Sequence, residues 1–178
     1  QKELYGKSCL VTAGPTQENI DPVRYVGNRS SGKMGLEIAI ALAEKGAEVN
    51  LIMGPSNLKS NHPNIKQINV VSADEMFYEV DTIFPNSDIS IFSAAVSDYK
   101  PTDYYTEKVK KTEDVWNISF EKNIDILKEM SKKKKDSQLI IGFALETEKE
   151  KENAIKKLQD KNLDLIVLNS TRDKESTF

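Results

Sequence analysis

Short, continuously apolar runs recur along this chain and are separated by segments with helical spacing. The clearest runs are 8–13 (SCLVTA), 48–53 (EVNLIM), 88–95 (DISIFSAA), 138–144 (QLIIGFA) and 163–169 (LDLIVLN). A strand that is apolar at successive positions has to be covered on both of its faces, which is the situation of a strand in a parallel sheet. These runs therefore predict buried, parallel strands.

The segments between the runs predict the helices that such a sheet needs. In the first of them, Met34, Ile38 and Leu42 recur at helical spacing after Gly32, and Gly46 is a typical helix stop. Ser72 followed by Glu75 forms a capping-box pattern at the start of a second helix. Two more helices are expected at 124–133 and 149–161, with further strands at 66–71 and 117–120. Strands alternating with helices predict an α/β fold with a Rossmann-like, doubly wound, mostly parallel sheet and helices on both faces.

A chain of 178 residues is long enough for one domain with a core and too short for two ordinary ones. We therefore expect a single nucleotide-binding domain over 1–178. The chain begins at Gln1 without a Met and ends in polar residues soon after a central-looking strand. We expect a fragment of a longer chain with an incomplete C-terminal end.

Composition removes several classes of chemistry. With one cysteine and one histidine, the chain has neither an internal disulfide nor a His-rich metal site. The formal net charge of −3 and the absence of an apolar run near 20 residues favour neither nucleic acid nor a membrane as partner. The basic run 132–135 has no interleaved aromatic residues and is interpreted as a solvated helix end. Chemistry here has to use Lys, Asn, Asp and backbone groups, and we expect a cytoplasmic protein.

Ligands of doubly wound sheets bind beyond the carboxyl ends of the strands, and the loops there are expected to begin at Gly14, Ala95, Gly142 and Asn169. One nearby segment, 27–35 (GNRSSGKMG), contains the spacing of a phosphate-binding P-loop. Met34 stands where that loop needs Ser or Thr, and the preceding stretch is polar, so an ordinary P-loop is disfavoured. Small residues opening a helix still predict an anion site, with a flexible glycine turn as the alternative.

The stretch 11–35, VTAGPTQENIDPVRYVGNRSSGKMG, closely resembles the phosphopantothenate–cysteine ligase family. That family carries Thr-Ala-Gly-Pro-Thr, then Asp-Pro-Val-Arg, then Asn-x-Ser-Ser-Gly-Lys-Met-Gly. Further matches follow in order at 94–99 (AAVSDY), 108–111 (KVKK), 142–147 (GFALET) and 161–165 (KNLDL). The resemblance covers about 11–169, which is most of the chain.

The resemblance implies a ligase that joins 4′-phosphopantothenate to cysteine in coenzyme A biosynthesis. The carboxylate attacks the α-phosphate of CTP, which releases pyrophosphate and leaves an acyl-cytidylate. The amine of cysteine then attacks the acyl group and releases CMP. Mg²⁺ is expected with CTP, carried mainly by the triphosphate and with few protein ligands. Neither step requires a histidine or a thiol of the protein.

Site residues follow from the matched motifs. Catalytic roles are expected for Asn28, in the second half-reaction, and for Lys108, on a mobile loop over the nucleotide. The expected nucleotide contacts are Phe92, Ser93, Ala94, Asp98, Lys108, Ile124, Asp125, Ile126, Leu127, Phe143, Lys157 and Lys161. The expected contacts to phosphopantothenate or another anion are Asn28, Ser30, Ser31, Gly32 and Lys33. The sequence departs from the family at Ile124, where members commonly carry proline, and the choice between CTP and ATP stays open.

The resemblance also implies a homodimer and, in the full-length chain, fusion to a flavin-dependent phosphopantothenoylcysteine decarboxylase.

Two rival functions are compatible with a doubly wound sheet of this kind. A nicotinamide-dependent oxidoreductase would need G-x-G-x-x-G at the first turn, where this chain has Ala13-Gly14-Pro15-Thr16. A non-enzymatic nucleotide-binding module would explain the phosphate-friendly loops but not Asn28 together with the lysines. Release of CMP and pyrophosphate would separate the ligase from both.

Overall fold

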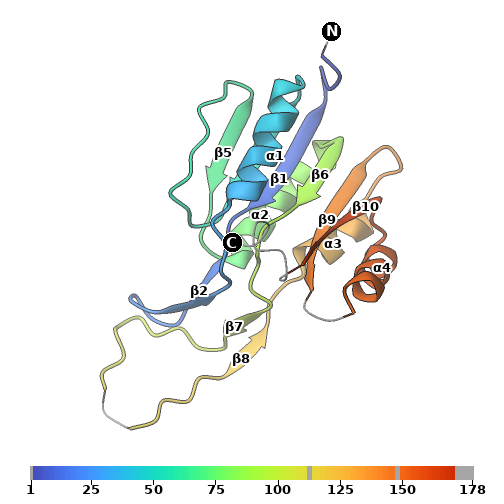
Figure 1. Ribbon diagram of the computed structural model, residues 1–178. Helices are drawn as coiled ribbons and strands as arrows, with labels where there is room; N and C mark the ends of the chain where they lie inside the picture. Colours follow the sequence, from blue (N-terminus) through green and yellow to red (C-terminus); the bar gives the residue numbers. More distant parts are fainter. Residues whose placement is uncertain (1, 112–113, 147–148, 171–178) are drawn as a thin grey trace.

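The computed structural model describes residues 2–111, 114–146 and 149–170. Its centre is a sheet of six strands in the order β10-β9-β6-β1-β4-β5 (Figure 1). The strands are β1 (Ser8–Ala13), β4 (Glu48–Met53), β5 (Ile65–Asn69), β6 (Ile89–Phe92), β9 (Leu139–Glu146) and β10 (Leu165–Ser170). All neighbouring pairs in this sheet are parallel. β1 has β4 on one side and β6 on the other, so the direction of winding changes between β1 and β6.

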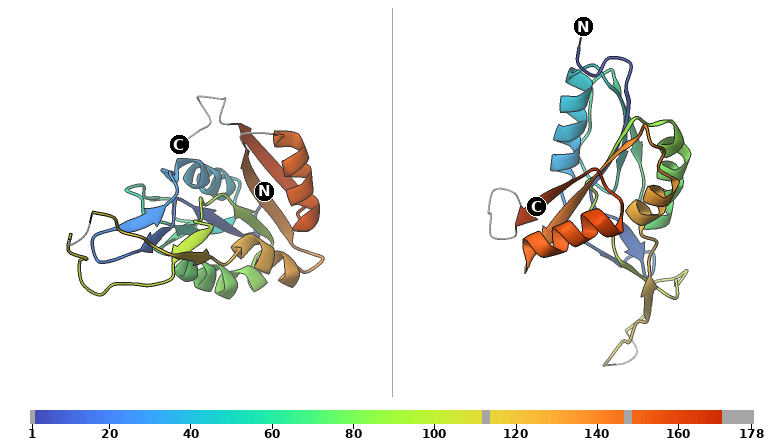
Figure 2. Two further views of the ribbon diagram at one scale, coloured as in Figure 1. Left: turned by 90° about the horizontal axis from the view of Figure 1, so that it is seen from below. Right: turned by 90° about the vertical axis from the view of Figure 1, so that its right-hand side faces the viewer.

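Helices cover both faces of the sheet. Helix α1 (Lys33–Glu44) packs on one face, where Leu36, Ala39 and Ala43 join the buried side chains of β1 and β4. Helices α2 (Ala73–Ile83) and α3 (Ile126–Lys133) pack on the other face, around Met76 and Met130. The right-hand view of Figure 2 shows this arrangement. Helix α4 (Glu150–Asp160) connects β9 to β10, and a 3₁₀ turn, η1 (Phe84–Asn86), follows α2. The predicted α/β, doubly wound fold is confirmed.

Several predicted boundaries differ from the structure. The strand predicted at 88–95 is shorter, because β6 ends at Phe92. The strand predicted at 138–144 is longer, since β9 continues to Glu146, so the loop does not begin at Gly142 as predicted. The strand predicted at 117–120 is shifted to β8 (Phe120–Lys122). In the capping box of α2, Ser72 accepts from the Glu75 backbone as predicted, but the Glu75 carboxylate accepts from Val71 instead of Ser72.

Two small antiparallel pairs were not predicted. β2 (Gln17–Asn19) pairs with β3 (Tyr25–Gly27), and β7 (Tyr99–Pro101) pairs with β8. Between β7 and β8 the chain makes a long excursion, residues 102–119, which we call the arm (Figure 1). Its base is closed by a hydrogen bond from the Thr102 amide to the Ser119 carbonyl at 3.0 Å. The arm lies beside the β2–β3 hairpin, where the Tyr105 amide donates to the Ile20 carbonyl at 3.0 Å.

The basic run 132–135 is engaged within the chain. Lys132 pairs with Glu129, Lys133 with Asp81 and Lys134 with Asp164, while Lys135 donates to the carbonyl of Pro85. Over the described residues, none of the helices combines the length and the hydropathy that crossing a bilayer requires.

Gly35 allows α1 to lie directly against the ends of β1 and β6. A Cβ atom on Gly35 would overlap the Ala13 methyl group and lie 2.7 Å from Ser93 Oγ. Gly35→Ala is therefore expected to push α1 off the sheet and to lower the free energy of unfolding by about 2 kcal/mol. Denaturant unfolding of this variant measures the loss. Glu44→Ala, exposed on the same helix, is the matched control and should stay within about 0.5 kcal/mol of wild type. An unchanged Gly35→Ala midpoint would show that the close approach is not required.

Asp164 fastens the start of β10 to β9. Its Oδ2 accepts from the Ile140 amide at 2.6 Å, and its Oδ1 accepts from Lys134 Nζ at 2.7 Å. Burial acts to raise the pKa of Asp164, but these two hydrogen bonds and the Lys134 charge outweigh it and hold the pKa below its ordinary value. The ionised carboxylate is thus favoured by folding.

Asp164→Asn should lower the free energy of unfolding by about 1 kcal/mol at pH 7. A carboxyl whose pKa is depressed in the folded state contributes stability above the unfolded pKa of about 3.9. This contribution is lost as the pH falls through the lower, folded value, so the difference between wild type and variant should close there. Urea unfolding across that pH range measures it, with the exposed Asp160→Asn as control. A difference independent of pH would contradict the assignment.

Candidate functional site

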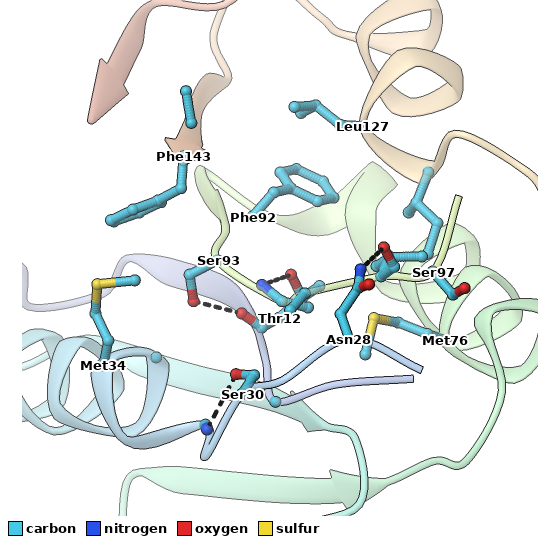
Figure 3. Close-up of a pocket in the computed structure, with 18 of the residues that line it drawn as sticks. Thr12, Asn28, Ser30, Met34, Met76, Phe92, Ser93, Ser97, Leu127 and Phe143 are labelled. Atoms are coloured by element: carbon cyan, nitrogen blue, oxygen red, sulfur yellow. Dashed lines mark hydrogen bonds between the residues drawn. The ribbon is translucent and has the colours of Figure 1, made fainter. Parts of the chain in front are cut away.

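A cleft of about 880 Å³ opens at the carboxyl ends of β1, β6 and β9 (Figure 3). This is the place where the direction of winding changes, and where ligands bind in doubly wound sheets. The structure brings every predicted site residue except Lys108 to the wall of this cleft. They come from the loop before α1, the end of β6, the start of α3, β9 and α4. The roles assigned to them from the resemblance remain predictions.

Hydrogen bonds between the ends of β1 and β6 form the floor of the cleft. Ser93 Oγ donates to the Thr12 carbonyl at 2.6 Å, and the Ala94 amide donates to Thr12 Oγ1 at 3.3 Å (Figure 3). One step further, the Ala95 amide donates to the Gly14 carbonyl at 2.9 Å. The pairing of the two strands thus continues past Phe92 and directs the loop towards Asp98 along the cleft.

Asn28 follows β3 directly and lies beside the loop after β6. Its Nδ2 donates a hydrogen bond to the Val96 carbonyl at 2.9 Å (Figure 3). A primary amide has two N–H donors and one acceptor oxygen, so this bond uses only one donor and fixes the orientation of the side chain. Asn28 is exposed. Its second N–H can therefore donate to a bound group.

The start of α1 forms one end of the cleft. Gly32, with φ of 80°, is the N-cap residue, and no side chain caps the helix. Ser30 Oγ accepts from the Gly32 amide and Ser31 Oγ accepts from the Lys33 amide, each at 3.3 Å. These bonds are long for an N–H to O contact, so an anion can replace them. The two amides of these bonds, the exposed Lys33 and the positive end of the helix together suit a phosphate or carboxylate.

Apolar side chains form another wall of the cleft. Phe92 at the end of β6 and Leu127 in α3 are both at most 8% exposed and belong to the same core cluster. Phe143, in β9, is partly buried and packs against the cluster on the opposite face of the sheet. Figure 3 shows the three side chains on the same side of the cleft. Two aromatic rings and a leucine provide a surface suited to a planar, weakly polar group such as a nucleobase.

The cationic side of the cleft is formed by α4 and the start of α3. Lys161 Nζ lies 2.9 and 2.7 Å from the two carboxylate oxygens of Asp125, which also caps α3 by accepting from the Lys128 amide. Lys157 Nζ donates to the Phe143 carbonyl at 2.7 Å. Burial acts to raise the pKa of Asp125, but hydrogen bonds from Lys161 and Lys128 and the charges of both cleft lysines lower it. Asp125 is therefore the anion beside this like-charged lysine pair.

Lys108 lies outside the cleft of its own chain. It is exposed in the arm, next to Val109, whose backbone is bonded to the turn between β2 and β3. Lys110 and Lys111 lie in the same segment. Thr147, the last residue of the motif at 142–147, falls outside the described residues. The chain end at 171–178 also lies outside them.

The cleft also contains residues that the sequence did not identify as site residues, including Thr12, Arg29, Glu37, Met76 and Asn169. Thr12 and Asn169 lie at the strand ends where the carboxyl-end rule predicts ligand loops, so that signal was available. No sequence pattern identifies Met76 as a site residue, because it lies on the buried face of α2 and belongs to a core cluster. No cluster of three or more His, Cys, Asp or Glu side chains that could hold a metal ion is found in the described part of the chain.

Known proteins are similar to this chain over most of its length. Residues 4–178 match the family model of the DNA/pantothenate metabolism flavoprotein C-terminal domain. The Haemophilus influenzae coenzyme A biosynthesis bifunctional protein CoaBC is 44% identical over 169 residues, which are 95% of this chain and 42% of that protein. A protein of an unknown prokaryotic organism, named cysteine/cysteine sulfinic acid decarboxylase, is 44% identical over 178 residues, which are 100% of this chain and 50% of that protein. The chain thus spans half or less of the length of these relatives.

A solved structure shows the same fold over most of the chain. The crystal structure of the C-terminal domain of the coenzyme A biosynthesis bifunctional protein CoaBC superposes with a TM-score of 0.81 at 43% identity. The match covers 94% of this chain and 79% of that one. The resemblance inferred from the sequence motifs is confirmed, and this chain belongs to the DNA/pantothenate metabolism flavoprotein C-terminal domain family.

Proposed function

We propose that this domain joins 4′-phosphopantothenate to cysteine through an acyl-cytidylate, with CTP as the nucleotide and Mg²⁺ bound to it, in cytoplasmic coenzyme A biosynthesis. The observation that carries the proposal is the single cleft that holds Asn28, the anion-binding start of α1, two aromatic rings and the Lys157–Lys161 pair. The names of the bifunctional relatives support the pathway. The rival functions do not account for this combination.

The nucleotide has a natural orientation in the cleft. Its base would lie against Phe92 and Phe143, with Asp98 and the 124–127 segment at its polar edges. The triphosphate would then reach Lys157 and Lys161, and Lys161 would exchange the Asp125 carboxylate for a phosphate. Mg²⁺ would neutralise phosphate charge in the reaction. Such an ion usually keeps its waters and the substrate phosphates as ligands, which fits a cleft with lysines and isolated carboxylates.

In the first half-reaction, a carboxylate oxygen of 4′-phosphopantothenate forms a bond to the α-phosphorus, and the bond to the pyrophosphate oxygen breaks. Ser30, Ser31, Gly32 and Lys33 would bind the anionic substrate and hold it in place for this in-line attack. In the second half-reaction, the cysteine nitrogen bonds to the acyl carbon, loses a proton, and CMP leaves. The free N–H of Asn28 would donate to the acyl-cytidylate as negative charge builds on it.

The first prediction of this proposal concerns activity and Asn28. Wild-type protein with Mg²⁺ and CTP should release pyrophosphate only when 4′-phosphopantothenate is present, and CMP once cysteine is added. Asn28→Asp removes the donor, so product formation should fall about 10²–10³-fold. Asn61→Asp, exposed and outside the cleft, is the control. Activity with ATP but not CTP would overturn only the nucleotide assignment. Unchanged product formation in Asn28→Asp would exclude the role of Asn28. If folded wild-type protein releases no pyrophosphate with either nucleotide, the ligase function is excluded.

The second prediction concerns Lys108 and the proposed homodimer. Since Lys108 lies outside the cleft of its own chain, we propose that the arm of a second copy brings it to the nucleotide. Lys108→Gln should then lower pyrophosphate release. A heterodimer of a Lys108→Gln chain and an Asn28→Asp chain would contain one site with both native residues.

Two affinity tags allow this heterodimer to be isolated after co-expression. It should recover about half of the wild-type activity per dimer, because one of two symmetric sites is intact. Each homodimeric variant is the control. An inactive heterodimer would show that Lys108 serves the cleft of its own chain, and unchanged turnover in Lys108→Gln would exclude a lid role altogether.

Fusion to a flavin-dependent decarboxylase in the full-length protein is likewise a proposal, supported by the word bifunctional in the relatives' name.

A further inference from the structure

The Asp-Pro-Val-Arg motif at 21–24 does not line the cleft, yet its first residue is a buried carboxylate. Asp21 lies in the turn between β2 and β3, and its side chain is 0% exposed. Its Oδ1 accepts from the amides of Val23 and Arg24, both at 2.8 Å, which closes the turn. These two bonds are local and account for only one of the two carboxylate oxygens.

The other oxygen binds a segment far away in the sequence. Asp21 Oδ2 accepts from the Val109 amide at 3.2 Å and pairs with Arg24 Nη2 at 2.9 Å. Arg24 Nη2 also donates to the Val109 carbonyl at 2.7 Å. Both backbone groups of Val109 are thus held by one Asp–Arg pair. Because Val109 stands between Lys108 and Lys110, this pair determines where the backbone of both lysines lies.

Aromatic contacts extend the same attachment along the arm. The Arg24 guanidinium carbon lies 4.6 Å from the centre of the Trp116 ring, within cation–π range. The Trp116 ring meets Tyr105 edge-on, with the ring centres 6.2 Å apart. With the Tyr105 amide bonded to Ile20, three positions of the arm contact the turn at 20–24.

The contacts around Asp21 favour the ionised form of its carboxylate. Burial acts to raise the pKa of Asp21, but hydrogen bonds from Val23, Arg24 and Val109, with the Arg24 charge, lower it below its ordinary value. All donors around the carboxylate are N–H groups. An amide in its place would put an NH₂ against at least one pair of donors in either orientation, so Asn cannot reproduce the bonds.

The same turn also leads to the other predicted catalytic residue. After Arg24 the chain forms β3 and reaches Asn28. We propose that Asp21 is a positioning residue for the ligase reaction, whose carboxylate binds the Val109 backbone and so sets the position of Lys108. This inference rests on the proposed function. Asp21 touches no reacting group and acts through Lys108.

Two readouts test the inference. Trp116 is the single tryptophan of the chain, so its fluorescence reports the contact with Arg24 directly. In Asp21→Asn its emission should shift to longer wavelength and acrylamide should quench it more strongly than in wild type. Asp103→Asn makes the same chemical change at an exposed position in the arm and should leave the emission unchanged. Val109→Pro removes the amide donor to Asp21 and leaves residues 20–24 unchanged in sequence, so its emission serves if Asp21→Asn does not fold.

Activity gives the second readout. Misplacement of a catalytic group typically costs about 10²-fold, so pyrophosphate release in Asp21→Asn should fall between about 10- and 100-fold. In a Lys108→Gln background the same substitution should cost less than about 2-fold, because its effect passes through Lys108. A merely structural role would instead lower both backgrounds equally.

The outcomes separate the two proposals. Shifted Trp116 emission with normal turnover, or equal losses in both backgrounds, would overturn the positioning role. Unchanged emission in both Asp21→Asn and Val109→Pro would show that the contact does not hold the arm, and would overturn it as well. Wild-type protein without pyrophosphate release would instead overturn the proposed function and, with it, any catalytic role of Asp21. The fluorescence result would then still report the Asp21–Val109 bond on its own.

Discussion

The parallel pairing of β1 with β6 is the interaction on which the cleft depends. These strands lie at the point where the sheet changes its direction of winding, so the chain leaves their carboxyl ends on diverging paths. The Thr12–Ser93 and Gly14–Ala95 bonds extend the pairing past the last strand residues and hold the two loops together. Gly35 lets α1 approach the same junction, which brings the start of the helix to the cleft. Helix α1 and the loop after β6 are both positioned against this junction.

The central sheet could be predicted from the sequence because strands buried on both faces require continuously apolar runs, and these runs are visible in the sequence. β1 and β4 begin and end at the predicted residues, since their apolar runs stop at Gly14 and Gly54. The small strands could not be predicted in this way. Gln17–Asn19 and Tyr99–Pro101 contain few apolar side chains and exist because another segment offers backbone partners. That information lies in long-range contacts, which hydrophobic periodicity does not record.

Which residues line the cleft could be predicted better than how these residues contact one another. The matched motifs selected residues that do line one cleft, with Lys108 as the exception. The motifs could not show that Asn28 donates to Val96, that Lys161 is paired with Asp125, or that the arm is bonded to the turn at 20–24. Each of these is a polar contact across more than 30 residues, and the residue types alone allow many partners. The position of Lys108 follows from such contacts.

The paired state of Lys161 is compatible with a nucleotide-binding role on energetic grounds. Its side chain and that of Asp125 are 20% and 44% exposed, so water screens the pair. Ion pairs of this kind contribute about 0–1 kcal/mol, which a bond to a more highly charged phosphate can replace. The Asp125 carboxylate contacts Lys161 directly, and its charge also acts on that of Lys157, so it offsets the repulsion between the two ammonium groups. Because Asp125 also accepts from the Lys128 amide as the cap of α3, its position does not depend on Lys161 alone.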